Sequence, residues 1–204
     1  MVTYKGLPGP VIGDHLTREA SRALYAGGTT FQIGKIEMVG NTGTYLDAPW
    51  HRWEDGPDLS ALPLDVLAGR DGVLVRAPLE KGLAVEARSF EKLDVRGKAV
   101  LVATGWDRFW GTTRYQERSP HLTREAAGLL VDGGAAIVGI DAHNIDDTDD
   151  RSRPAHTLLL RAGIPIVEHL TRLTELPGAG FRFFAIPVKV KGMGSFPVRA
   201  FAEV

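Results

Sequence analysis

Residues 39–56 read VGNTGTYLDAPWHRWEDG, and this stretch concentrates the chain's chemically reactive side chains. A carboxylate, Asp47, and an imidazole, His51, stand four residues apart with Pro49 between them. In a helix this spacing would place both groups on one face. A proline inside a helix is costly, however, and it pushes the preceding residue out of the helical region. The stretch is therefore predicted to be extended.

In an extended segment, successive side chains point to opposite faces. One face then presents an amide, a phenol, a carboxylate and an imidazole, which belong to Asn41, Tyr45, Asp47 and His51. Gly43 lies on the same face and leaves room for close approach of another group. An edge strand with a polar outer face would show the same pattern, so the stretch alone does not identify a site.

The composition is that of an ordinary globular protein. The chain has 204 residues, of which 44% are hydrophobic and 24% charged, which fits a single domain over residues 1–204 with an N-terminal arm and short helix in residues 1–28. A net charge of −1 gives no basic excess for nucleic acid or an anionic membrane. No apolar run approaches the roughly 20 residues of a membrane helix, and the start lacks a signal-peptide core. We therefore expect a cytoplasmic protein with neither partner.

Strand and helix patterns alternate along the chain. Helices are predicted at residues 17–25, 124–131 and 155–162, and strands at residues 33–39, 72–76, 98–104, 135–141 and 164–168. The order strand, helix, strand around residues 124–131 predicts a β-α-β unit. The tail is predicted to form two strands, 181–190 and 198–203, joined by a turn at 191–197. The chain is thus expected to be α/β with a substantial sheet.

Three separate elements carry groups that could bind one metal ion. They are Asp47 with His51, His156 in a predicted helix, and Glu168 at the end of a predicted strand. Because the chain has no cysteine, a metal would need histidine, carboxylate or carbonyl ligands, and two histidines with two carboxylates suit Zn²⁺, Mn²⁺ or Fe²⁺. Each group also has an ordinary interpretation. His156 could be a hydrogen-bonded helix residue, and Glu168 an acid at the start of the next segment.

The aromatic residues suggest where a substrate could bind. Two tryptophans, Trp50 and Trp53, flank the opening motif, while Trp106 and Trp110 follow a predicted strand. They could line a pocket for an aromatic substrate, although large aromatic residues pack in cores and interfaces at least as often. Trp50, Trp53 and Trp106, together with Asn41, are the candidate substrate-binding residues.

The loop after residue 141 is rich in acids. Its run at residues 146–150 lacks the glycine and terminal glutamate of a calcium-binding EF-hand loop, so we interpret it as a solvated turn. His143 and Asn144 in this loop are weaker candidates for contact with a substrate.

The opening stretch resembles the H-x-G-T-H-x-D-x-P-x-H signature of the cyclase family, which includes bacterial kynurenine formamidases and isatin hydrolases. Further segments resemble other parts of that family, from roughly residue 29 to the C-terminus. These are the segment Pro154-Ala155-His156 followed by Glu168, the segment Val138-Gly139-Ile140-Asp141, and the closing segments at residues 185–189 and 195–200.

The resemblance implies a swivelling β/α/β-type fold with a mixed sheet or barrel-like core. It implies a metal-dependent hydrolase, similar to arylformamidases of tryptophan catabolism, that opens amides or cyclic amides and forms a homodimer or homotetramer. The implied ligands of a divalent metal, Zn²⁺ or Mn²⁺, are Asp47, His51, His156 and Glu168. Asn41 and Tyr45 replace two signature histidines that serve a second metal in two-metal relatives, so we expect one metal.

General metal chemistry then suggests a mechanism. A bound Zn²⁺ lowers the pKa of its water towards about 7, which provides a nucleophile for the carbonyl of a small-molecule amide or lactam. The resulting oxyanion would be held by the metal or by a nearby donor, and Tyr45 could be that donor or simply a packing residue. His51 could act as a ligand, which we favour, or as a proton shuttle. The alternative is a binding protein that kept the fold and the metal but lost turnover.

Overall fold

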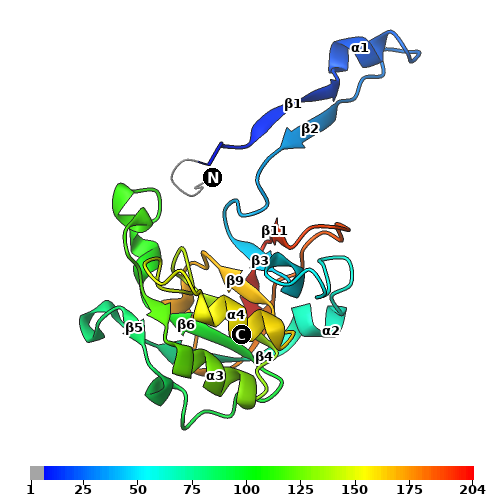
Figure 1. The fold of residues 1–204 in the computed structure, drawn as a ribbon. Coiled ribbons are helices and arrows are strands. Elements are labelled where there is room, and N and C mark those ends of the chain that lie inside the picture. Colours follow the sequence, from blue (N-terminus) through cyan, green and yellow to red (C-terminus); the bar gives the residue numbers. More distant parts are fainter. Residues whose placement is uncertain (1–6) are drawn as a thin grey trace.

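Eight strands form one mixed sheet in the order β11-β3-β9-β8-β6-β4-β10-β12. The structure is a computed structural model that describes residues 7–204 (Figure 1). The strands of this sheet are β3 (Tyr45–Asp47), β4 (Ala68–Arg76), β6 (Ala99–Ala103), β8 (Ile137–Ile140), β9 (Ile166–Glu168), β10 (Ala179–Phe184), β11 (Ser195–Pro197) and β12 (Phe201–Glu203). A separate short pair is formed by β5 (Ala84–Val85) and β7 (His121–Leu122).

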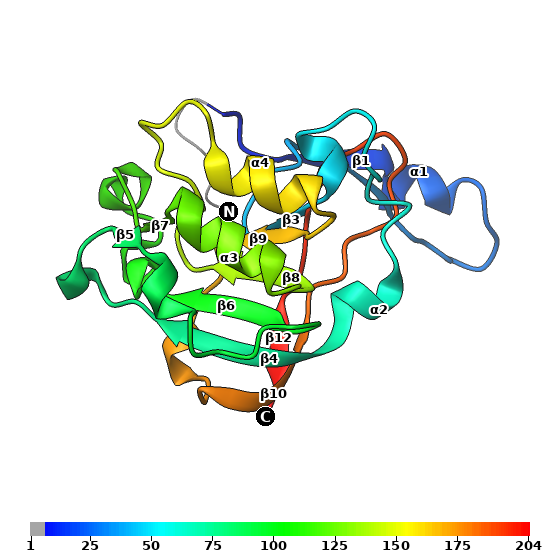
Figure 2. The same ribbon diagram turned by 60° about the horizontal axis from the view of Figure 1, so that its bottom comes forward.

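The centre of the sheet is parallel, and helices connect its strands. Strands β4, β6, β8 and β9 run parallel to one another. Helix α3 (Arg124–Asp132) links β6 to β8, and α4 (Pro154–Arg161) links β8 to β9. Both helices cover the same face of the sheet (Figure 2). The predicted β-α-β unit is therefore confirmed. Helix α3 is capped by Thr123, whose hydroxyl accepts a hydrogen bond from Ala126 N.

The core has two layers, one on each side of the sheet. Side chains along β6 alternate between them, since Val100 and Val102 pack under the helices while Leu101 points to the other face. That second layer is enclosed by the curled sheet itself, with Leu46 of β3 and Phe181 of β10 in the same cluster. The mixed sheet with a barrel-like core that was expected from the resemblance is thus the observed architecture.

The N-terminal part of the described chain forms an arm that extends away from the sheet (Figure 1). It consists of β1 (Val11–Leu16), the short helix α1 (Arg18–Arg22) and β2 (Ile33–Glu37), with β1 and β2 antiparallel. The Thr17 hydroxyl caps α1 by accepting a hydrogen bond from Ala20 N. The strand β1 was not predicted, and residues 1–6 of the predicted arm lie outside the described residues. Within the described chain, no helix is long and apolar enough to cross a bilayer.

The opening motif is extended over only three residues. After β3 the chain turns at Ala48 into a 3₁₀-helix, Pro49–His51, which has the proline at its start. The prediction of a continuous extended stretch up to His51 was therefore wrong. A proline fits the first position of a helical turn because its fixed φ is suitable and no N–H is needed there. The turn, rather than strand alternation, brings His51 back towards Asp47.

The prediction for the C-terminal tail was half right. Strands β10 and β12 pair antiparallel, as expected of a hairpin. The segment between them is not a simple turn, because it contains β11, which lies at the opposite edge of the sheet and pairs with β3. Gly194 permits this approach, since a Cβ there would lie 2.5 Å from the backbone N and Cα of His51. The tail therefore contributes directly to the surroundings of the opening motif.

Candidate metal centre

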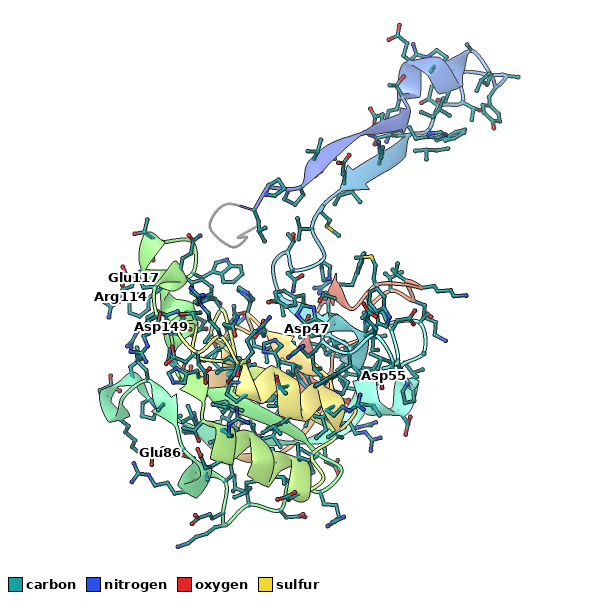
Figure 3. The ribbon with its side chains drawn as sticks, viewed as in Figure 1. Asp47, Asp55, Glu86, Arg114, Glu117 and Asp149 are labelled. Atoms are coloured by element: carbon teal, nitrogen blue, oxygen red, sulfur yellow. The ribbon has the colours of Figure 1, made fainter. Side chains whose placement is uncertain are left out.

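Four segments meet where the parallel strands of the sheet end. Asp47 ends β3, Glu168 ends β9, His156 lies in the first turn of α4, and His51 lies in the 3₁₀-helix after β3. Asp47, His156 and Glu168 are fully buried. Asp47 lies in the body of the molecule, below the point where the arm leaves it (Figure 3). Ligands of open α/β sheets bind outside the carboxyl ends of parallel strands, which is where Glu168 is found.

The spacing of these groups fits the coordination shell of a cation. His156 Nε2 lies 3.5 Å from Asp47 Oδ2 and 3.6 Å from Glu168 Oε1. The ring of His51 adjoins these groups, with its Nδ1 3.6 Å from Asp47 Oδ1. Two ligands held tetrahedrally at zinc distances of 2.0–2.2 Å are about 3.4 Å apart. Asp47, His51 and His156 each offer a ligand atom within 4.8 Å of the other two. Glu168 adjoins this trio through His156.

One oxygen of this cluster lacks a hydrogen bond. Asp47 Oδ2 is buried and accepts no hydrogen bond from the described residues, although its partner oxygen accepts one from Ser195. A buried carboxylate oxygen without a partner is unfavourable by several kcal/mol. A divalent cation beside Asp47, His156 and Glu168 would remove that cost, so the residues present fit a metal ion.

The protonation of the cluster follows from its crowding. Burial raises the pKa of Asp47, but the adjacent His156 imidazole, the charge of His51 and the Ser195 hydroxyl together bring it below its usual value. Burial raises the pKa of Glu168, and the negative charge of Asp47 raises it further. Burial opposes protonation of His156, yet the charge of Glu168, the hydrogen bond to Asp146 and the adjacent Asp47 carboxylate raise its pKa to about 9. Without a metal, the cluster therefore holds a proton on His156.

Asp146 orients His156 from behind. His156 Nδ1 lies 2.6 Å from Asp146 Oδ2, and the other oxygen, Oδ1, accepts a hydrogen bond from Ala155 N at 2.6 Å. Asp146 is 1% exposed, so the interpretation of residues 146–150 as a solvated turn was wrong for its first residue. A signal was available in the sequence. Helix α4 begins at Pro154 after Arg153, which offers no capping side chain, so its first N–H groups need an acceptor from elsewhere.

Tyr45 supports Glu168 from the adjacent strand. Its ring is buried, and its hydroxyl donates a hydrogen bond to Glu168 Oε2, while Ile145 N donates to Oε1 at 2.7 Å. The structure therefore gives the phenol a partner within the cluster. The role of oxyanion donor for Tyr45 stays a prediction.

A cleft of about 270 Å³ opens beside His51. Asn41, Trp50 and Ser195 line it, together with the loop at residues 192–194. Of the four residues predicted to bind substrate, Asn41 and Trp50 are in this lining. Trp53 packs against the guanidinium groups of Arg52 and Arg161, each 4.9 Å from its ring. Trp106 is buried in the core, and its indole N–H donates a hydrogen bond to the Tyr115 carbonyl.

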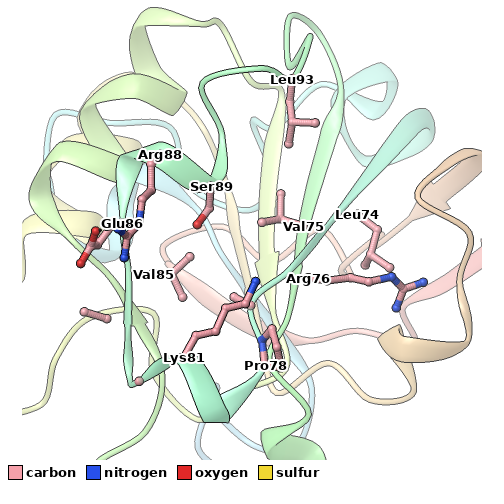
Figure 4. A pocket seen from close by; sticks show the side chains of 13 residues that line it. Leu74, Val75, Arg76, Pro78, Lys81, Val85, Glu86, Arg88, Ser89 and Leu93 are labelled. Atoms are coloured by element: carbon pink, nitrogen blue, oxygen red, sulfur yellow. Dashed lines mark ion pairs between the residues drawn. The ribbon is translucent and has the colours of Figure 1, made fainter.

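A larger cavity, of about 650 Å³, lies elsewhere, near the end of β4 (Figure 4). Its lining is apolar at Leu74 and Val85 and charged at Lys81 and at the ion pair of Arg88 with Glu86. Of the described residues that line it, none belongs to the acid and histidine cluster. Volume alone would therefore point away from the chemically distinctive site.

A second histidine group adjoins Glu168. His169 has a left-handed backbone, with φ of 58°, and its Nδ1 lies 3.1 Å from the Tyr115 hydroxyl. Burial lowers its pKa to about 3, and burial also lowers the pKa of His143 nearby, so both imidazoles are neutral. The sequence pointed to His143 as a weaker candidate but not to His169, whose position depends on a backbone conformation that the sequence does not signal.

Comparisons with known proteins identify the family. Residues 8–147 match the model of the Cyclase family, described as "Putative cyclase". The chain is 29% identical over 168 residues to the kynurenine formamidase of Bacillus cereus, which covers 82% of this chain and 78% of that protein.

Solved structures share the fold. A structure of an isatin hydrolase bound to the product analogue thioisatinate superposes with a TM-score of 0.82 at 22% identity, over 98% of this chain and 83% of that one. A structure described as a potential metal-dependent hydrolase with cyclase activity gives a TM-score of 0.75 at 26% identity, over 98% and 92%. The mixed α/β fold expected from the resemblance is thereby confirmed. The family model matches well over half of this chain, and the chain therefore belongs to the Cyclase family.

Proposed function

We propose that this protein is a metal-dependent hydrolase that cleaves a C–N bond of an amide or cyclic amide. The observation that carries this proposal is the position of His156 Nε2, 3.5 and 3.6 Å from oxygens of two buried carboxylates. The relatives point the same way, since one is named kynurenine formamidase and a structural neighbour is described as a potential metal-dependent hydrolase. A cytoplasmic location stays a prediction from the sequence.

Asp47, His156 and Glu168 would hold the metal, with His51 as a fourth group at the edge of the cleft. Imidazole and carboxylate donors suit Zn²⁺ or Mn²⁺. When bound, such a cation lowers the pKa of a water molecule and polarises a carbonyl group. A single metal is expected, because a neutral phenol such as Tyr45 and an amide such as Asn41 are poor ligands.

The residues around the cleft would position a small-molecule substrate. Trp50 exposes 38% of its surface and could stack on an aromatic ring, and the Asn41 amide could bind a substrate carbonyl. His51 is partly exposed at the cleft, and burial, the largest effect, lowers its pKa, so its neutral ring could accept a proton from the nucleophile or pass one to the leaving nitrogen. An aromatic amide or lactam is the substrate class that fits these groups.

The central test combines metal analysis with activity. The purified protein should contain about one divalent metal per chain and hydrolyse at least one member of a panel of aryl formamides, lactams and lactones. Removing the metal with a chelator should abolish this hydrolysis, and adding Zn²⁺ or Mn²⁺ should restore it. His156→Ala should lose both metal and activity while remaining folded, because a chain of this length has a core that does not need a metal.

Two results would contradict the proposal in different ways. A stoichiometry near two metals per chain would refute the single-metal site. Normal metal content without hydrolysis of any compound in the panel would favour the alternative, a member of the fold that binds metal without turnover.

Asp146→Asn should weaken metal binding and activity by roughly 10–100-fold. The Asp146 carboxylate accepts a hydrogen bond from His156 Nδ1 and so keeps the ring in one orientation. Loss of a group that orients a metal-binding histidine in this way typically has an effect of this size. Titration with Zn²⁺ and a competing chelator measures the affinity. Asp149→Asn is the matched control, because Asp149 is in the same loop but its side chain is 76% exposed. Equal affinities for the two variants would show that Asp146 has no role in the site.

The stability of the metal-free protein should fall as the pH rises. His156 has a pKa of about 9 in the folded chain and an ordinary value of 6.5. The stabilisation from its charge is therefore complete below pH 6.5 and is lost as the pH rises through 9. Urea unfolding of metal-free protein from pH 6 to pH 9.5 measures this fall. His156→Gln should flatten it, and an equally steep curve for that variant would disprove the assignment.

Metal affinity should change in the opposite direction across the same range. Because a metal displaces the proton from His156, apparent affinity should rise by about tenfold per pH unit up to pH 9.

The arm suggests how the chain associates. Six large apolar side chains on the arm have exposed fractions between 44% and 77%. They are Val11, Ile12, Leu24, Tyr25, Ile33 and Ile36. An isolated two-stranded hairpin is only marginally stable in water. In the described chain the arm packs mainly on itself (Figure 1). We therefore propose a homodimer in which each arm lies on the second copy, and a homotetramer would be a pair of such dimers.

Charges placed on the arm should separate the copies. Ile12 and Ile36 face each other across β1 and β2, so the double variant Ile12→Lys, Ile36→Lys removes apolar area from both strands. Light scattering after size exclusion should show a dimer or tetramer for the unchanged protein and a smaller mass for the variant. Leu64→Lys is the control, because Leu64 is 62% exposed on the body. A monomer for the unchanged protein would refute the proposal.

A further inference from the structure

Ser195 lies between the two groups of the opening motif. It begins β11 and is the register partner of Asp47 on β3. Its side chain is buried, and its hydroxyl contacts two different partners, Asp47 Oδ1 through a short hydrogen bond and His51 Nδ1 at 2.8 Å. The sequence drew attention to this residue only as part of a segment that resembles the family's closing strands.

The direction of these two hydrogen bonds follows from counting protons. A serine hydroxyl has one hydrogen to donate, and an ionised carboxylate can only accept. Asp47 is flanked by two imidazoles and therefore takes the serine hydrogen. The contact of Ser195 Oγ with His51 must then be made by a hydrogen on Nδ1 of the imidazole. The reverse arrangement would point an oxygen lone pair of Ser195 at the buried Asp47 oxygen, which is unfavourable.

We propose that Ser195 is a positioning residue that holds His51 in the tautomer with hydrogen on Nδ1, so that Nε2 is the atom that acts in the site. A neutral imidazole has only one N–H, so its other nitrogen is left with a free lone pair. That lone pair could bind a metal or accept a proton, and this role of Nε2 rests on the proposed function. The hydrogen bonds that fix the tautomer do not depend on it.

His156 shows the same arrangement on the other side of Asp47. Its Nδ1 is held by Asp146 at 2.6 Å, and its Nε2 is the nitrogen nearest to Asp47 and Glu168. The two imidazole centroids are 5.8 Å apart. Both rings are therefore fixed through Nδ1 by a side chain outside the proposed ligand set. For His156 the fixing group is a carboxylate, whereas for His51 it is a hydroxyl that is itself bonded to Asp47.

The tautomer can be read directly by nuclear magnetic resonance. In ¹⁵N-labelled, metal-free protein, long-range ¹H–¹⁵N correlation spectra distinguish the protonated ring nitrogen from the other one, and His51→Gln identifies the His51 signals. We expect the Nδ1-protonated form in the unchanged protein at neutral pH. Ser195→Val should shift His51 towards the Nε2-protonated form that predominates in free histidine. Ser195→Thr keeps the hydroxyl and matches valine in shape, so it should retain the original tautomer.

Kinetics and metal binding supply an independent readout. Ser195→Val should lower kcat by roughly 10–100-fold with little change in KM, and Ser195→Thr should recover most of that loss. Zinc affinity should follow the same order if His51 is a ligand. Circular dichroism and urea unfolding of the two variants control for folding, and Ser195→Ala replaces Ser195→Val if valine does not fit.

The inference is overturned by either of two results. One is an Nε2-protonated His51 in the unchanged protein, and the other is an unchanged tautomer in Ser195→Val or Ser195→Ala. These results do not depend on turnover. If the unchanged protein hydrolyses no compound in the panel, the proposed function fails, while the spectra still decide the role of Ser195.

Discussion

Burial of three carboxylates at one end of the sheet is the constraint on which this structure depends. Asp47, Asp146 and Glu168 are each at most 1% exposed. Moving an ionised carboxylate out of water costs several kcal/mol even after the protein relaxes. Such a cost is met only where hydrogen bonds and positive charge converge. The fold therefore has to place hydrogen-bond donors and positive charges next to these carboxylates. The surrounding elements provide them in two ways.

The backbone supplies part of this compensation. Ile145 N donates to Glu168, and the first N–H groups of α4 donate to Asp146. These donors are fixed by the sheet and by a helix end, so they do not have to be ordered at a further cost in entropy.

Side chains supply the rest, and one of them is a cation. A guanidinium nitrogen of Arg153 lies 3.0 and 3.2 Å from the two ring nitrogens of His156. Since the two nitrogens point in different directions, a group this close to both lies over the face of the ring. Arg153 has a left-handed backbone, with φ of 46°, which is a strained conformation for a residue other than glycine. The strain places a positive charge beside the acidic cluster at the start of the helix that carries His156.

Sequence reasoning found the groups that carry charge and missed those that orient them. Asp47, His51, His156 and Glu168 could be picked out because metal ligands have a restricted chemistry and occur in recognisable motifs. Ser195 and Asp146 look like ordinary polar residues, and their roles appear only when β11 is found next to β3 and the acidic loop under α4. The helices were predictable from caps and periodicity. The placement of β11 was not, because it depends on pairing between segments that are far apart in the sequence.

Tyr45 shows how the residue type at one position can change the interactions that a site makes. It stands where the resemblance aligns a signature histidine, and in this chain its phenol donates to Glu168. A histidine at that position could offer a lone pair to a second cation. A phenol hydroxyl instead offers a hydrogen, and a hydrogen-bond donor to a carboxylate fixes the direction of that carboxylate's remaining lone pairs. Glu168 is then held by Tyr45 on one oxygen and by a backbone amide on the other. Under the proposed function, this position would help to orient the ligands of one metal ion and would not bind a second one. His156 and His51 are likewise held by side chains outside the proposed ligand set.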